Sequence, residues 1–242
     1  MRMRVEHLDD ALGIGRPDPR LSWQLPTGST RQDAYELEVD GTSYGVVLSP
    51  NNVLVGWPAA PLTSRQRTTV RVRVSADGHR LDWSEPTEIE AGLLHPDDWT
   101  AAWVAPDEGE VARPGHRPAY RLRGTVRVDR PVVRARLHVT ARGVHETYVD
   151  GARVGDVQLA PGFTDYDHQV DVRTHDVTVA MTAGEHVVVA LLADGWFRGR
   201  VGALRSSDQW GEQTAYLAQV VLDHEDGTTT VHGTGADWEW ST

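Results

Sequence analysis

The chain has 242 residues, and its 39% hydrophobic and 24% charged residues are typical of a folded globular protein rather than a disordered one. It contains no cysteine, which excludes disulfide bonds and thiolate metal sites. Its net charge of −11, without any basic block, argues against nucleic-acid binding. No segment is apolar over the length of a membrane span, and the N-terminus lacks the apolar core of a signal peptide. We therefore expect no membrane partner and a cytoplasmic protein, while secretion stays open.

Strand patterns dominate the chain from the N-terminus onward. β-Branched residues or an apolar/polar alternation predict strands over 34–41, 69–78, 132–140, 146–155, 185–195 and 215–234, with another starting near Ala119. Asp-Gly pairs predict tight turns at 40–41, 77–78, 150–151 and 226–227. One helical turn is expected near 177–182, capped by Asp176 and stopped by Gly184. The arginines that alternate with valine over 70–74 should share one solvated face.

These elements predict an all-β protein of two domains. The segment 83–118 begins as a strand and then becomes rich in Pro, Asp, Glu and Gly, which places a boundary within 92–98. Residues 1–95 have the length of a fibronectin-III/Ig-like β-sandwich. Residues 96–242 fit a jelly-roll β-sandwich, although length alone would also allow other β folds.

Two patterns bear on catalysis. Gly41-Thr-Ser-Tyr-Gly45 matches the Gly-x-Ser-x-Gly motif of serine hydrolases, but that motif needs a helix after it, and residues 46–52 cannot open one. A Gly-rich turn is the expected alternative. The carboxylate pairs Asp97/Asp98 and Asp165/Asp167 lie in loop-like segments, without the pocket that raises the pKa of a general acid. We predict no catalytic residue in this chain.

Metal-binding patterns are incomplete as well. The eleven histidines never fall into a ligand spacing. Asp-His-Glu-Asp-Gly-Thr, at 223–228, lacks the spacing and the closing glutamate of a calcium loop and predicts a hairpin turn instead. We expect no metal site and no cofactor, with calcium as a minority alternative.

An ordered set of segments resembles the amino-terminal region of bacterial α-L-rhamnosidases. These segments are VEHLDDALGIGRPDPRLSWQL (5–25), RQDAYELEVDG (31–41), WSEPTEIEAGLL (83–94), DDWTAAWV (97–104), LAPGFTDYDHQVDVRTHDVT (159–178) and LLADGWFRGRVG (191–202). Each is only moderately specific, whereas their common order over nearly the whole chain is strong. The chain departs from the family by lacking its tryptophan near 42–45, and by carrying Asp150-Gly151 where Asn-Gly is frequent.

The resemblance implies a fibronectin-III-like domain followed by a rhamnosidase N-terminal jelly roll similar to carbohydrate-binding modules. In the family, an (α/α)₆ barrel carries the catalytic acids of an inverting glycoside hydrolase, and no such barrel is present here. We therefore expect a non-catalytic part of an α-L-rhamnosidase, inactive alone, which positions or stabilises the downstream catalytic domain. Its other expected partner is a rhamnose-containing glycan or glycoside. The alternative is a self-standing lectin-like or scaffold module.

The segment 191–202 offers a candidate carbohydrate site. Trp196 could stack on the apolar face of a sugar ring, with Asp194, Arg198 and Asp150 as hydrogen-bonding partners. The competing interpretation is structural: Trp196 closes the end of the sandwich or packs against a neighbouring domain. We favour the structural role, because the segment recurs in the family whatever the sugar specificity.

Overall fold

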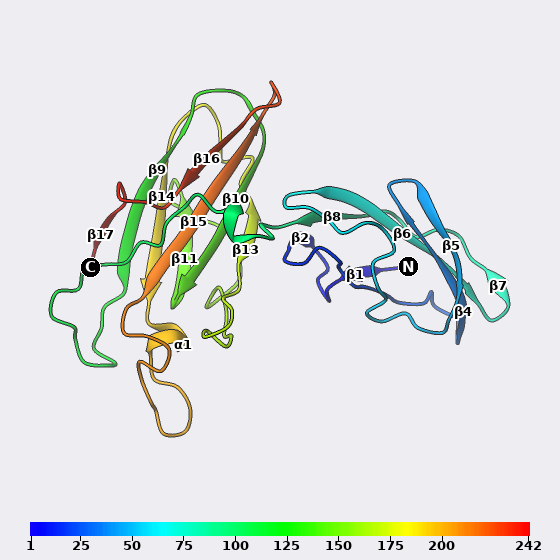
Figure 1. Ribbon diagram of the computed structural model, residues 1–242, viewed down its shortest axis with the longest axis horizontal. Helices are drawn as coiled ribbons and strands as arrows, with labels where there is room; N and C mark the ends of the chain where they lie inside the picture. The colour runs from blue at the N-terminus through cyan, green and yellow to red at the C-terminus, as the bar shows by residue number, and fades with distance from the viewer. The chain divides into compact units, whose positions relative to one another are not determined.

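The computed structural model describes residues 1–242, and strands account for nearly all its regular structure (Figure 1). The chain divides into two compact units, Met1–Asp98 and Trp99–Thr242, each with a hydrophobic core of its own. The helices are a 3-10 helix at Pro96–Asp98 and the one-turn helix α1 at Gly195–Arg198. Neither has the length or the apolar character of a membrane span. The all-β prediction is confirmed.

The first unit is an Ig-like β-sandwich. Its small sheet pairs β1 with β3, and its large sheet has the order β2-β8-β6-β4-β5, with β7 paired to β6. Only β2 and β8 run parallel to each other. The strands are β1 (Met3–Val5), β2 (Ala11–Ile14), β3 (Leu21–Trp23), β4 (Gln32–Val39), β5 (Thr42–Leu48), β6 (Arg67–Ala76), β7 (His79–Arg80) and β8 (Thr87–Ala91).

Strand β6 shows how the sequence pattern produces this sandwich. Val70, Val72 and Val74 are buried in the core, since alternate side chains of a strand point to one face. The intervening Arg71 and Arg73 share the other face, as predicted, but their side chains are half-buried rather than fully solvated. Their guanidinium carbons sit 4.8 and 4.4 Å from the ring centroid of Trp83.

The second unit is a jelly-roll β-sandwich of two sheets, and its hydrophobic core draws on the inward faces of both. One sheet has the order β13-β10-β15-β16 and the other β12-β11-β14-β9-β17. The strands are β9 (Tyr120–Val128), β10 (Val132–Arg142), β11 (Val144–Val149), β12 (Ala152–Arg153), β13 (Arg173–Asp176), β14 (Gly184–Ala193), β15 (Ala215–His224), β16 (Thr229–Gly233) and β17 (Glu239–Ser241).

Turns follow the local predictions, while the helical content differs from them. Asp150 and Gly151 connect β11 to β12 with φ angles of +49° and +81°, as a tight hairpin turn requires. The expected helical turn is a single hydrogen-bonded turn in which Met181 N donates to Val177 O at 3.2 Å. The helix α1 was not predicted. At four residues it is too short for hydrophobic periodicity to reveal it.

Candidate functional site

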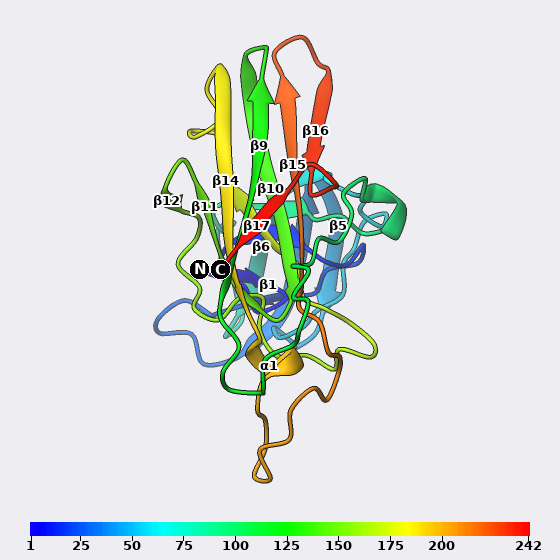
Figure 2. The same ribbon diagram turned by 90° about the vertical axis from the view of Figure 1, so that its left-hand side faces the viewer.

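The helix α1 and the chain that follows it lie at one end of the second domain (Figure 2). Strand β14 ends at Ala193, and Gly195 then turns the backbone with a φ of +53°. A Cβ at Gly195 would lie 2.6 Å from Cγ1 of Val144, so only glycine fits this close approach. The Asp-Gly pair thus ends the strand and starts the helical turn that carries Trp196.

A buried cluster of ion pairs includes Arg198 of α1 and Asp194, which directly precedes the helix. Arg198 is fully buried and donates from Nη2 to Oε2 of Glu108 at 2.5 Å. Arg117 donates from Nη1 to Oδ1 of Asp208 at 2.7 Å. Asp194 lies between the two cations, 3.5 Å from Nη1 of Arg117 and 3.7 Å from Nε of Arg198. The cluster therefore ties together α1 and the loops on both sides of it.

The carboxyl groups of the cluster are not equivalent. The hydrogen bond from Arg198 holds the pKa of Glu108 below its usual value. Burial raises the pKa of Asp194, although the positive charges of Arg198 and Arg117 act in the opposite direction. Asp194 is therefore the carboxyl group of the cluster whose charge the surroundings stabilise least.

Aromatic rings from α1 and from two other segments of the chain contact one another next to the helix. Phe163 is 57% exposed, and its ring centroid lies 6.3 Å from that of Trp196 and 5.6 Å from that of Trp210, both edge to face. Tyr166 lies behind them, 5.3 Å from both Trp210 and Phe197. Three of these rings border an open pocket of about 550 Å³. Its lining residues are Phe163, Trp196, Arg200, Val201, Gly202, Gln209 and Trp210.

The structure brings together three of the four predicted site residues. Trp196, Asp194 and Arg198 share the α1 turn, but the buried ion pairs engage the two charged side chains. Asp150 is not part of this group. It accepts from His186 Nδ1 and Val187 N, at the start of β14, whereas α1 follows the end of that strand. The prediction that turns bring Asp150 to Trp196 is wrong, because β14 separates them by its own length.

Sequence reasoning missed the residues that complete the site. Glu108 and Arg117 fall in the stretch rich in Pro, Asp, Glu and Gly that precedes the strand near Ala119, and nothing in its pattern marks them as buried. Phe163 and Trp210 come from separate loops. Their one signal is an aromatic residue next to a glycine within a polar stretch, as in Gly162-Phe163 and Trp210-Gly211.

The other candidate patterns do not form catalytic sites. Ser43 lies on the exposed strand β5, with no helix after it, and its hydroxyl donates to Glu36 at 2.7 Å. Asp98 accepts from Ser64 at 2.5 Å, and Asp165 accepts from the exposed His168. No group of three or more His, Cys, Asp or Glu side chains is arranged to hold a metal ion.

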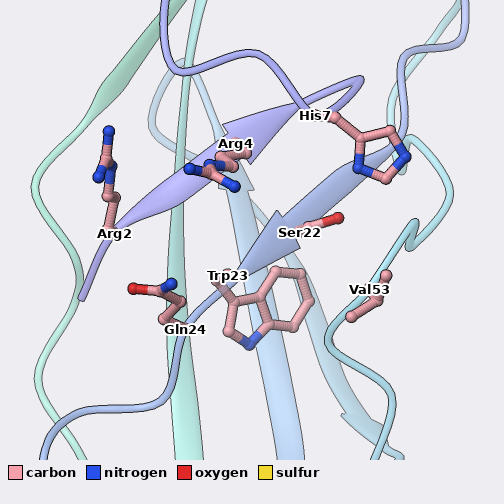
Figure 3. Close-up of a pocket in the computed structure, with 7 residues that line it drawn as sticks. All are labelled: Arg2, Arg4, His7, Ser22, Trp23, Gln24 and Val53. Carbon is pink, nitrogen blue, oxygen red and sulfur yellow. The ribbon is translucent and has the colours of Figure 1, made fainter.

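A second pocket, of about 230 Å³, lies in the first domain around β1 and β3 (Figure 3). Its lining residues are Arg2, Arg4, His7, Ser22, Trp23, Gln24 and Val53. Arg2 and Arg4 both pair with Asp9 at 2.7 Å, and this pairing offsets part of the positive charge. Neither of the two pockets is lined by a carboxylate.

Comparisons with known proteins cover both domains. Residues 1–95 match the family described as "Rha78A-like, N-terminal immunoglobulin domain", and residues 130–242 match "Alpha-L-rhamnosidase N-terminal domain". An α-L-rhamnosidase of Alteromonas sp. (strain LOR) is 30% identical over 253 residues, which are 94% of this chain and 27% of that protein. The chain thus spans about a quarter of the length of this curated relative.

Solved structures agree with the sequence matches. The crystal structure of native α-L-rhamnosidase from Aspergillus terreus is 34% identical, with a TM-score of 0.88, over 100% of this chain and 29% of that one. The α-L-rhamnosidase of Streptomyces avermitilis, crystallised with L-rhamnose, shares the fold with a TM-score of 0.85 at 23% identity, over 100% of this chain and 41% of that one. The chain consists of an Ig-like domain followed by a rhamnosidase N-terminal domain, and it corresponds to the N-terminal region of α-L-rhamnosidases.

Proposed function

We propose that this chain is the non-catalytic N-terminal part of an α-L-rhamnosidase, and that it stabilises or positions the catalytic part of the same enzyme. A rhamnose-containing glycan or glycoside is the second partner in this proposal. The observation that supports the non-catalytic role is that the carboxylates lie outside the two pockets. Glycoside hydrolysis uses two carboxyl groups that flank the scissile bond, and neither pocket described above is lined by one.

The best-placed carboxyl groups near a pocket support the same conclusion. Glu108 and Asp194 lie close to α1, but arginines hold both carboxylates in ion pairs. A general acid needs a raised pKa together with access to substrate. The pKa of Glu108 is lowered, and Asp194 does not line the aromatic pocket.

The test has two parts. Purified residues 1–242 are incubated with an aryl α-L-rhamnoside, and we expect no release of the aryl group. The product of the reading frame that contains residues 1–242 is then compared with the same product lacking residues 1–98. We expect the shortened product to inactivate at a lower temperature, because it has lost a folded supporting domain.

Two results would overturn this proposal. Turnover by residues 1–242, abolished by a carboxylate substitution within them, would make the chain itself an enzyme. Unchanged inactivation temperature and turnover after removal of residues 1–98, and likewise after removal of 99–242, would refute the supporting role.

A further inference from the structure

The pocket of the first domain lies on the face of the small sheet that points away from the core (Figure 3). Arg4 is the exposed central residue of β1, and Ser22, the central residue of β3, lies opposite it. Their neighbours on both strands are buried, and alternate side chains of a strand point to opposite faces. Arg2 and Gln24 continue the outward face, since the N–H of Gln24 donates to the carbonyl of Arg2 at 3.1 Å. The two strands thus present a row of polar side chains to the pocket.

Most hydrogen-bond donors of this row are not used within the chain. Arg4 donates from Nε and Nη2 to the two carboxylate oxygens of Asp9, at 2.7 and 3.3 Å, which leaves both N–H groups of Nη1. Arg2 pairs with Asp9 through Nη2 at 2.7 Å. The hydroxyl of Ser22 accepts from the N–H of Leu54 at 2.9 Å, so its own proton remains to be donated. A pocket lined by such donors and by no carboxylate is suited to an anion.

The charge balance of the pocket sets the charge of its ligand. Arg2 and Arg4 carry the two permanent positive charges of the lining, and Asp9, which lies outside it, is the one carboxylate that pairs with them. One positive charge is therefore left over, in a chain whose net charge is −11. A monoanion balances this charge, whereas a phosphate dianion would bring a surplus negative charge into the pocket. Guanidinium groups also match the planar fork of a carboxylate.

The remaining lining suits the hydrocarbon part of a small ligand. Val53 is 63% exposed, and it borders the pocket together with the indole of Trp23 and the imidazole of His7 (Figure 3). At about 230 Å³ the pocket is smaller than the roughly 300–1,000 Å³ typical of drug-sized ligands, so a single ring with one charged group is the appropriate size. We propose that this pocket binds a small aromatic monocarboxylate such as benzoate. This inference does not depend on the proposed supporting role.

The walls around the ligand ring are fixed before a ligand binds. Trp23 is 3% exposed, its Nε1 donates to Oε1 of Gln32 at 2.8 Å, and its ring meets that of Tyr35 edge to face at 5.1 Å. The turn that carries His7 is closed by two backbone hydrogen bonds between Val5 and Leu8, at 3.1 and 2.8 Å. A preformed wall costs less entropy on binding than a mobile one.

The experiment is a titration of the 242-residue chain with sodium benzoate at constant ionic strength, followed by NMR at the Trp23 indole N–H and at the backbone amides of residues 2–9. We expect saturable shifts with a dissociation constant on the order of millimolar. Benzamide, the neutral analogue of the same shape, should bind at least about tenfold more weakly, because hydrogen bonds to a charged group are stronger. Acetate, which lacks the ring, and inorganic phosphate should also bind more weakly than benzoate.

Substitutions with opposite effects identify the groups that hold the carboxylate. Arg4→Met should weaken benzoate binding by about tenfold or more, and Arg4→Lys, which keeps the charge but not the fork, should restore only part of the affinity. Asp9→Asn removes the carboxylate that competes for the same N–H groups. It should strengthen benzoate binding by about two- to fivefold, which is the range of an exposed ion pair. A gain of affinity cannot result from a loss of folding.

Arg127 and Asp129 provide the matched control in the second domain. They form an exposed pair of the same kind, with Nε donating to Oδ1 at 2.7 Å, and neither residue lines one of the two pockets. Arg127→Met and Asp129→Asn change the net charge of the chain exactly as Arg4→Met and Asp9→Asn do. Both control variants should bind benzoate with the affinity of the wild type.

Any of three results would overturn the inference. The first is the absence of saturable shifts up to about 50 mM benzoate. The second is an equal affinity for benzamide, which would show that the carboxylate is not recognised. The third is a wild-type affinity in either Arg4→Met or Asp9→Asn. None of these results bears on the supporting role, which is tested by the inactivation of the longer product.

Discussion

Arg198 and Glu108 form an ion pair with both side chains almost completely buried, 0% and 6% exposed. Burying two charges is costly, and the pair recovers this cost only through close geometry and additional hydrogen bonds. Here the surrounding Arg117, Asp194 and Asp208 extend the pair into a five-residue cluster. The cluster fixes the segment that carries Trp196, which makes it the structural foundation of the candidate site.

Arg198→Ala should therefore be strongly destabilising. It leaves Glu108 buried without its cation, at a cost of about 3–5 kcal/mol. In a domain of this size we expect the melting temperature to fall by roughly 10 °C in a thermal scan. Arg205→Ala, at an exposed position of the following loop, is the control and should melt like the wild type. The double variant Arg198→Met/Glu108→Leu should recover most of the loss. Arg198→Ala melting within a degree or two of the wild type would contradict the importance of the pair.

Acid should destabilise the second domain through His145. Burial, followed by the positive charges of His175 and Arg173, lowers the pKa of His145 from 6.5 to about 4. The unfolded chain binds the proton below about 6.5 and the folded one only near 4. Stability is therefore complete above pH 6.5 and is lost as pH falls toward 4, on the order of 3 kcal/mol in all.

Urea unfolding of wild type and His145→Asn between pH 7 and 4 tests this expectation. The variant cannot take up the proton and should lose less stability than the wild type over this window. His79→Asn, at an exposed position on β7, serves as the control and should follow the wild type. Parallel pH profiles for wild type and His145→Asn would rule out His145 as the source of acid sensitivity.

Glu36 gives the first domain an acid dependence in a lower window. Its carboxylate accepts from Ser43, Arg73 and Arg80 at 2.7, 2.7 and 2.6 Å, and these hydrogen bonds lower its pKa from 4.5 to about 2. Stability is present above pH 4.5 and is lost as pH falls toward 2. We expect Glu36→Gln to cost about 1–3 kcal/mol at pH 7 and little near pH 2.

Denaturant unfolding, followed at the Trp83 indole of the first domain, tests this prediction. Glu88→Gln removes a 75% exposed carboxylate of the same sheet and should change the stability by much less. A cost of Glu36→Gln that is the same at pH 2.5 and at pH 7 would show that the lost hydrogen bonds do not depend on the charge of Glu36.

Gly124 leaves room for the indole of Trp238, which packs against the hydrophobic core of the second domain. A Cβ at this position would lie 2.3 Å from Cε2 of Trp238, so Gly124→Ala must displace the indole. We expect a destabilisation of about 1–3 kcal/mol, measured by denaturant unfolding. Gly56→Ala is the control, since a Cβ there meets nothing within 4 Å. If the clash is the cause, Gly124→Ala should cost clearly less in a Trp238→Ala background, and strictly additive costs would speak against it.

The strands and hairpins could be predicted because their signals are local. The alternation of Val70, Val72 and Val74 determines which face of β6 is buried, whatever lies opposite. Asp150-Gly151 favours a hairpin turn through its own backbone preferences. The aromatic residues at 196–197 likewise marked the stretch that proved to hold a pocket.

The sequence by itself thus determined the β architecture and drew attention to Trp196. Only the tertiary structure decided what the neighbouring residues do. The sequence pattern suggests Arg198 as a sugar-binding residue. In the structure, its side chain is buried against Glu108, 90 residues away along the chain. Asp150 faces His186 at the start of β14, away from α1. The physical reason is that burial of a charge depends on a partner brought close by the packing of distant segments, and no local pattern records that partner.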